Sequence, residues 1–152
     1  FYRCIAIDLS HPSSFVHEFG HMLDYTQGGL SNCLNSRDFE KVYKMYVDLI
    51  DKKLEESGEA AVAHYKKGGK KSKYNYYTRE TEVFANSFEV YISDVLHLSN
   101  TIIESPEEYE KNPLVYHMEN EEYMQLVRDY FSQLPCMSDL VSYIYDDSDS
   151  AA

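Results

Sequence analysis

The sequence lacks long apolar runs. No stretch of about eighteen consecutive apolar residues occurs, which excludes a conventional transmembrane helix. The first residues, FYRCIAIDLS, lack the length and the flanks of a signal peptide. We therefore expect a soluble domain, compatible with a protein that is secreted, delivered into a host cell or cytoplasmic. Because the chain opens on Phe1 rather than Met and reaches its first motif almost at once, we expect it to be cut from a longer protein.

Cysteine is scarce. The chain has only Cys4, Cys33 and Cys136, an odd number of widely spaced residues without a CxxC motif. A disulfide scaffold needs paired cysteines, and a thiolate zinc site needs several of them at close spacing. The sequence therefore suggests neither class, and we interpret the cysteines as ordinary core or surface thiols.

Positive charge is also in short supply. The chain has 14 Lys and Arg residues against 26 Asp and Glu residues, and its formal net charge is -12. This charge repels nucleic acid and anionic membranes, so we expect neither as a partner. The exception is KKGGKKSK, from Lys66 to Lys73, where five lysines flank two glycines. We interpret it as a solvated loop, with binding of an acidic partner as the alternative.

Strand signals are nearly absent, whereas helical signals fill most of the chain. Only residues 4–9 (CIAIDL) predict a strand, because they are apolar and partly β-branched. Apolar periodicity, caps and stop signals predict helices over about residues 15–25, 36–57, 59–67, 78–96 and 120–134, and a short helix opened by Ser105-Pro106. The expected fold class is mainly α, with at most a small β element.

The length fits one domain of ordinary size. We expect this domain to cover residues 1–145 and to be a monomer in isolation. The acidic segment 146–152 (DDSDSAA) has the composition of a flexible tail.

The strongest motif is HEFGH, residues 17–21. Side chains four apart on a helix emerge from one face, so the imidazoles of His17 and His21 can share a cation. Two nitrogen ligands at this spacing suit zinc, which in catalytic sites keeps one position open for water. Glu18 can accept the proton of that water and pass it to a leaving amine. The motif is the general signature of a zinc metallopeptidase.

The third ligand separates the classes of such enzymes. A metzincin would need glycine at position 24 and histidine at position 27, where this chain has Asp24 and Gln27. That class is excluded. A gluzincin takes a glutamate from a later helix, and the segment ETEVFANSFE supplies Glu80, Glu82 and Glu89 as candidates.

Two segments carry a resemblance. HEFGHMLDY followed by ETEVFANSFEVY resembles the HEFGH and E-x-E-F-F-A-E-A-F pair of gluzincin peptidases of the anthrax lethal factor type. It is also similar to the ExFARxFExY pattern of zincin-like domains in phage and mobile-element polyvalent proteins. The resemblance implies a toxin or effector metalloendopeptidase that acts on a protein or peptide substrate. It implies one catalytic Zn²⁺ bound by His17, His21 and Glu82, with Glu18 as general base and acid. In the families that this chain resembles, an acidic residue follows the motif and holds a histidine or the helix junction, and Asp24 matches that residue.

Helix geometry gives a separate reason to prefer Glu82. Asn86 and Glu89 follow it at plus four and plus seven, so a polar stripe runs along the helix from Glu82. Glu80 lies about 200° away, beside the apolar stripe. Asn86 departs from the resemblance, because relatives of lethal factor carry a second glutamate there.

The oxyanion donor is the second departure. Relatives of lethal factor place a tyrosine seven residues before the ligand glutamate, whereas this chain has Asn75 there, flanked by Tyr74, Tyr76 and Tyr77. A phenol near zinc would donate to the negative charge of the tetrahedral intermediate. We expect Tyr76 or Tyr77 to have this role, with His64 as the next candidate.

Two other functions remain open. The domain could be a catalytically silent zincin-like module that binds zinc or a partner within an effector or a phage polyvalent protein. The intact Glu18 speaks against this. It could also be a helical interaction domain in which HEFGH is incidental and the lysine-rich loop binds an acidic partner. Stoichiometric zinc in the purified protein would exclude the second alternative.

Overall fold

The computed structural model describes Ile5 and residues 10–26, 37–96, 102–112, 114–134 and 137. Its elements are α1 (Ser14–Thr26), α3 (Arg37–Glu56), α4 (Glu59–Lys66), the 3-10 helix η1 (Gly69–Lys71), α5 (Lys73–Tyr77), α6 (Glu80–Leu96), α7 (Pro106–Glu110) and α8 (Glu121–Ser132). These residues form no β-sheet, so the predicted mainly α fold is confirmed. The strand predicted at residues 4–9 lies outside the described residues, apart from Ile5.

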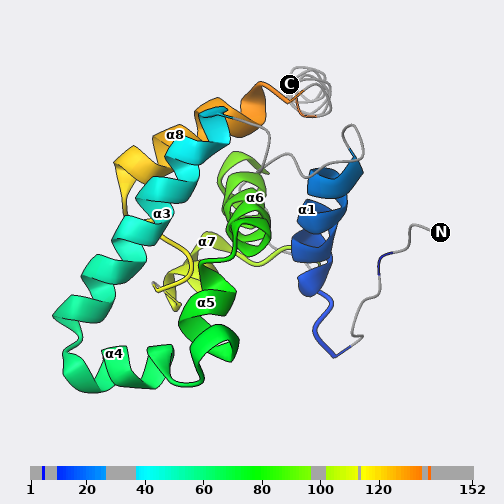
Figure 1. Ribbon diagram of the computed structural model, residues 1–152. Coiled ribbons are helices and arrows are strands. Elements are labelled where there is room, and N and C mark those ends of the chain that lie inside the picture. The colour runs from blue at the N-terminus through cyan, green and yellow to red at the C-terminus, as the bar shows by residue number, and fades with distance from the viewer. Residues whose placement is uncertain are drawn as a thin grey trace, which may run out of the picture.

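Helix α6 is the centre of the fold. Figure 1 shows α1 along one side of α6, with α3 and α8 together on the other side and α5 near one end. Every residue from 82 to 93 is buried as a result, including the polar side chains of Glu82, Asn86 and Glu89. The face of α6 that the sequence shows as polar is therefore turned towards other helices rather than towards solvent.

An aromatic core joins α6 to α3 and α8. The ring of Phe84 lies 5.2 Å from the rings of both Phe39 and Phe131, measured between centroids. These side chains are almost fully buried, and their packing against one another contributes beyond the apolar area that they remove from water. The core fixes the position of α6 relative to α3 and α8, and α1 packs on the opposite side of α6.

The predicted helices are confirmed, with a shift at one start. The side chains of Ser105 and Asn120 cap α7 and α8 by accepting from the backbone N–H groups of Glu108 and Tyr123. Thr78, expected to open α6, instead ends α5, and its hydroxyl donates to the carbonyl of Tyr74 at 2.8 Å. Helix α6 therefore begins at Glu80.

The lysine-rich segment is an ordered turn rather than a plain loop. Gly68 and Gly69 have positive φ values of 101° and 55°, a conformation that glycine adopts without a steric penalty. The side chains of Lys66 and Lys73 lie over the rings of Tyr74 and Tyr65. The lysines are exposed, as predicted.

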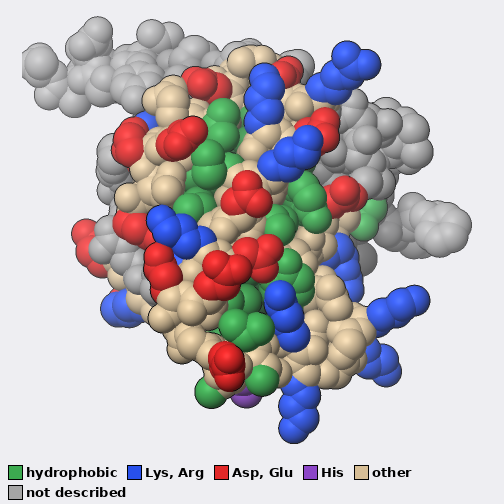
Figure 2. Space-filling view, turned by 60° about the vertical axis from the view of Figure 1, so that its left-hand side comes forward, with side chains coloured by type: hydrophobic (Ala, Val, Ile, Leu, Met, Phe, Trp, Pro, Cys, Tyr) green, Lys and Arg blue, Asp and Glu red, His purple; other side chains and the backbone are tan. Residues whose placement is uncertain are grey.

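The surface carries both signs of charge. The face shown in Figure 2 intersperses carboxylates with lysines and arginines around small apolar areas. Helix α3 has the ion pairs Lys44–Glu40 at 2.6 Å and Lys41–Asp38 at 3.1 Å, each between side chains one turn apart. Among the described residues, no helix combines the length and the apolar character that crossing a bilayer requires.

Candidate metal centre

Helices α1 and α6 approach each other closely at Gly20. A Cβ atom at this position would lie 3.1 Å from Ala85 Cα and 3.3 Å from Phe88 Cδ1. Such contacts are tighter than side chains normally make, so glycine permits the close approach of the two backbones. The face of α1 that carries the histidines is thereby placed against the buried polar face of α6.

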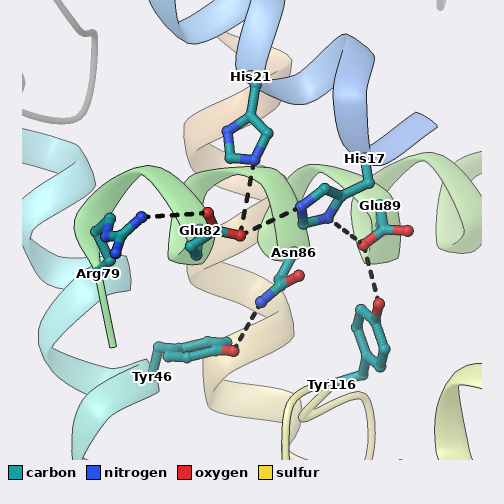
Figure 3. Close-up of polar contacts among 8 residues, drawn as sticks. All are labelled: His17, His21, Tyr46, Arg79, Glu82, Asn86, Glu89 and Tyr116. Atoms are coloured by element: carbon teal, nitrogen blue, oxygen red, sulfur yellow. Dashed lines mark hydrogen bonds and ion pairs between the residues drawn. The ribbon is translucent and has the colours of Figure 1, made fainter. Parts of the chain in front are cut away.

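The three predicted metal ligands meet at this crossing. His17 Nε2 lies 3.4 Å and His21 Nε2 lies 3.7 Å from Glu82 Oε2, as Figure 3 shows. The two imidazole rings are nearly perpendicular, at 88°, with centroids 4.8 Å apart. One potential ligand atom from each residue lies within 4.8 Å of the other two. The structure therefore brings together one turn of α1 and a glutamate that is distant in the sequence.

The donor set fits a zinc ion. Glu82 Oε2 is buried and has no hydrogen bond of regular geometry, because both imidazole nitrogens are farther away than the usual 2.7 to 3.2 Å. Leaving a buried carboxylate oxygen without such a bond is costly. A tetrahedral zinc with metal–ligand distances of about 2.1 Å places its ligand atoms about 3.4 Å apart. The two nitrogen–oxygen distances are close to this separation.

The charges of the cluster are strongly coupled. Burial alone would lower the pKa of His17, but Glu82 and Glu89 outweigh it and raise the pKa to about 10. Burial alone would raise the pKa of Glu82, but His17, His21 and Tyr76 lower it well below its usual value. Glu82 is therefore ionised at neutral pH, and a cation that binds His17 must displace a proton.

Glu89 orients His17. Its Oε2 atom lies 3.0 Å from His17 Nδ1 and accepts a hydrogen bond from the Tyr116 hydroxyl, also at 3.0 Å. This oxygen acts as an acceptor towards Tyr116, so we assign the hydrogen of the contact with His17 to Nδ1, and Nε2 on the other side of the ring faces Glu82. Carboxylate–histidine pairs of this kind fix the ring and raise the basicity of the ligating nitrogen.

The sequence placed Glu89 on the correct face but did not assign it this role, and it did not single out Tyr116. At position 86, where the resemblance implies an outer carboxylate, this chain has Asn86, and the carboxylate that contacts His17 belongs to Glu89, two helical turns after Glu82. Asn86 makes a different contact, since its Nδ2 donates to the buried Tyr46 hydroxyl at 3.0 Å. The polar stripe of α6 could have suggested Glu89, whereas the loop that carries Tyr116 has no pattern that points to the site.

The tyrosine cluster divides into different environments. The Tyr74 hydroxyl donates to Asp51 Oδ2 at 3.2 Å and is held by α3. Burial, followed by the influence of the nearby Glu82 carboxylate and by the charges of Tyr77 and Glu18, raises the pKa of Tyr76 to about 12. The pKa of Tyr77 is raised as well, first by burial and then by the neighbouring Tyr65 and Glu82.

The remaining candidates are placed as follows. Glu18 is partly exposed on α1, between the two histidines. Asp24 is fully buried in the last part of the same helix. His64 is exposed on α4, where its ring lies edge-on to Tyr65 with centroids 5.7 Å apart. No described contact joins His64 to His17, His21 or Glu82.

Among the described side chains, His17, His21 and Glu82 therefore form a group that could hold a metal ion. Comparison with protein families, with curated proteins and with solved structures finds no significant match to this chain. The interpretation of the site consequently depends on its own residues and geometry.

Proposed function

We propose that this chain is a zinc-dependent metalloendopeptidase of the gluzincin kind. The observation that carries the proposal is the Glu82 carboxylate, which is buried against the imidazoles of His17 and His21 at distances that suit a shared zinc ion. These three residues would hold the ion. When bound, zinc would act as a Lewis acid that polarises a peptide carbonyl and lowers the pKa of water.

Residues of the chain supply the proton transfers and the orientation. Glu18 accepts a proton from the attacking water and returns it to the leaving amine. Its partial exposure leaves it accessible to a substrate. Tyr76 is 45% exposed, so its hydroxyl can turn from Glu82 to the developing oxyanion when a peptide binds. Glu89 and Tyr116 hold the His17 ring in one orientation throughout.

The alternative of a silent zinc-binding module shares these ligands and differs only in turnover. Glu18 distinguishes the peptidase from the silent module. It is not one of the proposed ligands, and no ion pair or hydrogen bond described for it gives it a structural role. A carboxylate in this place, next to a metal site with an open position, is the general base of a hydrolase.

The test compares the wild type with Glu18→Gln in an unbiased peptide-library digest, with zinc content measured on the same samples. We expect the variant to keep stoichiometric zinc and to lose most of its turnover, because only the proton acceptor is removed. Glu80→Gln is the matched control, since it removes one carboxylate outside the ligand cluster and should leave cleavage unchanged. Cleavage by Glu18→Gln at the wild-type rate would refute the proposed mechanism. Wild type that binds zinc and cleaves no peptide would favour the silent module.

A further inference from the structure

A cavity of about 330 Å³ lies directly beside the metal ligands. His17 borders it, so one imidazole ring separates the cavity from the position that zinc would occupy. Its other walls include Glu89, Glu104, Glu108, Tyr109 and Tyr116. These residues come from α6, from α7 and from the segments that flank α7. His11, Ser13, Ser14 and His17 complete the lining, so the cavity is formed by the start of α1 together with parts of the chain that are distant from HEFGH in sequence.

The lining of this cavity is negatively charged. Three of its side chains are carboxylates, and the basic side chains of the lining are His11 and His17. Glu108 pairs with Lys111 and Glu89 with His17, whereas no ion pair of Glu104 is described. The negative potential is also felt by Tyr109, whose pKa is raised by burial and then by Glu89 and Glu104.

A buried hydroxyl in the wall points to a ligand. Tyr109 is only 2% exposed, yet its hydroxyl oxygen has no hydrogen bond of regular geometry, although Glu89 and Glu104 lie nearby. Such a group is costly to bury unless a ligand completes its hydrogen bonding. A cationic N–H group is a suitable partner, because it can donate to the phenol oxygen and to the surrounding carboxylates together.

The aromatic rings complete the complementarity. Tyr109 and Tyr116 lie with centroids 4.7 Å apart at 58°, and both rings line the cavity. Aromatic rings accommodate an alkyl stem, and their faces attract a cation. Carboxylates, phenol oxygens and aromatic carbon are the groups that recognise a lysine or arginine side chain.

We propose that this cavity binds a cationic group of the peptide substrate, an alkylammonium or guanidinium, next to the scissile bond. The proposal rests on the proposed function and adds a substrate class to it. A lysine or arginine side chain presents this chemistry, and so does the free amino terminus of a peptide.

The experiment uses three amino acid hydroxamates, whose hydroxamate group chelates zinc. They are the hydroxamates of Nα-acetyl-lysine, of N-acetyl-norleucine and of norleucine with a free amine. The first differs from the second by a cation at the end of the side chain, and the third differs by a cation at the amino terminus. Binding to the zinc-loaded wild type is measured by titration calorimetry, which requires no turnover. The variants are the double substitution Glu104→Gln, Glu108→Gln and the control Glu107→Gln, an exposed neighbour on α7 that does not line the cavity.

We expect the lysine hydroxamate to bind about tenfold more tightly than the acetylated norleucine hydroxamate, as charged hydrogen bonds at a partly open site allow. The double variant should remove this difference and leave the affinity for the norleucine compound unchanged, while Glu107→Gln retains it. A preference for the free-amine compound would also support a cationic site and would assign the cation to the amino terminus. Equal affinities for all three compounds in the wild type would overturn the inference, as would a Glu107→Gln variant that loses the preference equally.

The results for this site and for the proposed function are separable. A wild type that prefers the cationic compounds but cleaves no peptide would refute the peptidase and retain the cationic site. A wild type that cleaves peptides but binds all three compounds equally would refute the cationic site and retain the peptidase.

Discussion

Substituting Glu89 by glutamine tests whether this residue holds His17 in place for a metal. The carboxylate is 4% exposed, and its Oε2 atom has two partners at 3.0 Å, His17 Nδ1 and the Tyr116 hydroxyl. Glutamine preserves the shape of the side chain, and its oxygen can still accept a hydrogen bond, but the negative charge is lost. The imidazole then becomes a weaker ligand, and its orientation is held less firmly.

The expected loss of zinc affinity follows from the contact between Glu89 and His17. Removing an outer partner of a ligating histidine lowers metal affinity by roughly 10- to 100-fold, or about 1.4 to 2.7 kcal/mol. Alanine would be a poorer choice than glutamine at position 89. It would leave the His17 and Tyr116 donors buried without an acceptor, at a cost to folding of about 1 to 3 kcal/mol for each group.

The assay is zinc competition against a chromophoric chelator, with thermal unfolding of the zinc-free proteins measured in parallel. Asn86→Ala is the matched control, because Asn86 lies between Glu82 and Glu89 on the same helix and binds Tyr46 instead of a histidine. This control should lower the thermal stability and leave zinc affinity within a few fold of wild type. If Asn86→Ala weakened zinc binding more than Glu89→Gln did, the assignment of Glu89 would be wrong.

Three further outcomes are expected. Glu82→Ala should reduce zinc affinity sharply in a titration, whereas Glu80→Ala should keep metal content near wild type; the opposite ranking would assign the third ligand to Glu80. Tyr76→Phe should lower turnover by roughly 10- to 1000-fold at unchanged zinc content, while Tyr74→Phe leaves the kinetics intact, and equal rates for both variants would place the oxyanion donor elsewhere. Zinc affinity should rise as the pH increases from neutrality towards 10, because His17, with a pKa raised to about 10, must release a proton on binding. Calorimetry in buffers of different ionisation enthalpy measures this release, and an affinity independent of pH would contradict it.

The parts of the site that the sequence could predict are those set by local spacing. His17, Glu18 and His21 belong to one helix, and the period of that helix places the two histidines on one face. Glu82 was predicted from a second local pattern, the polar stripe of its helix, together with a resemblance in the same segment. In each case the relevant geometry lies within a few turns of one element.

The parts that it could not predict depend on contacts between elements. The hydrogen bond between Glu89 and His17 depends on how α1 packs against α6. Tyr116 reaches Glu89 from a loop that has no periodic pattern. Helix α5 was missed because the five residues Lys73–Tyr77 are too short to show a helical pattern. The helix depends on the buried cap Ser72, whose hydroxyl accepts from the Asn75 N–H at 3.1 Å.

Gly20 shows why the ligand motif cannot be separated from the packing of the fold. Within HEFGH the glycine offers no chemistry, yet it lies where a Cβ would be 3.1 Å from Ala85 Cα, a backbone atom that cannot rotate away. Relieving such a contact requires α1 to move from α6 by a few tenths of an ångström. Zinc–ligand distances are held to within about 0.2 Å, and the proposed ligands come from both helices. The separation of His17 and His21 from Glu82 is therefore set by the smallest residue of the motif and by the partners of α6 on its opposite side.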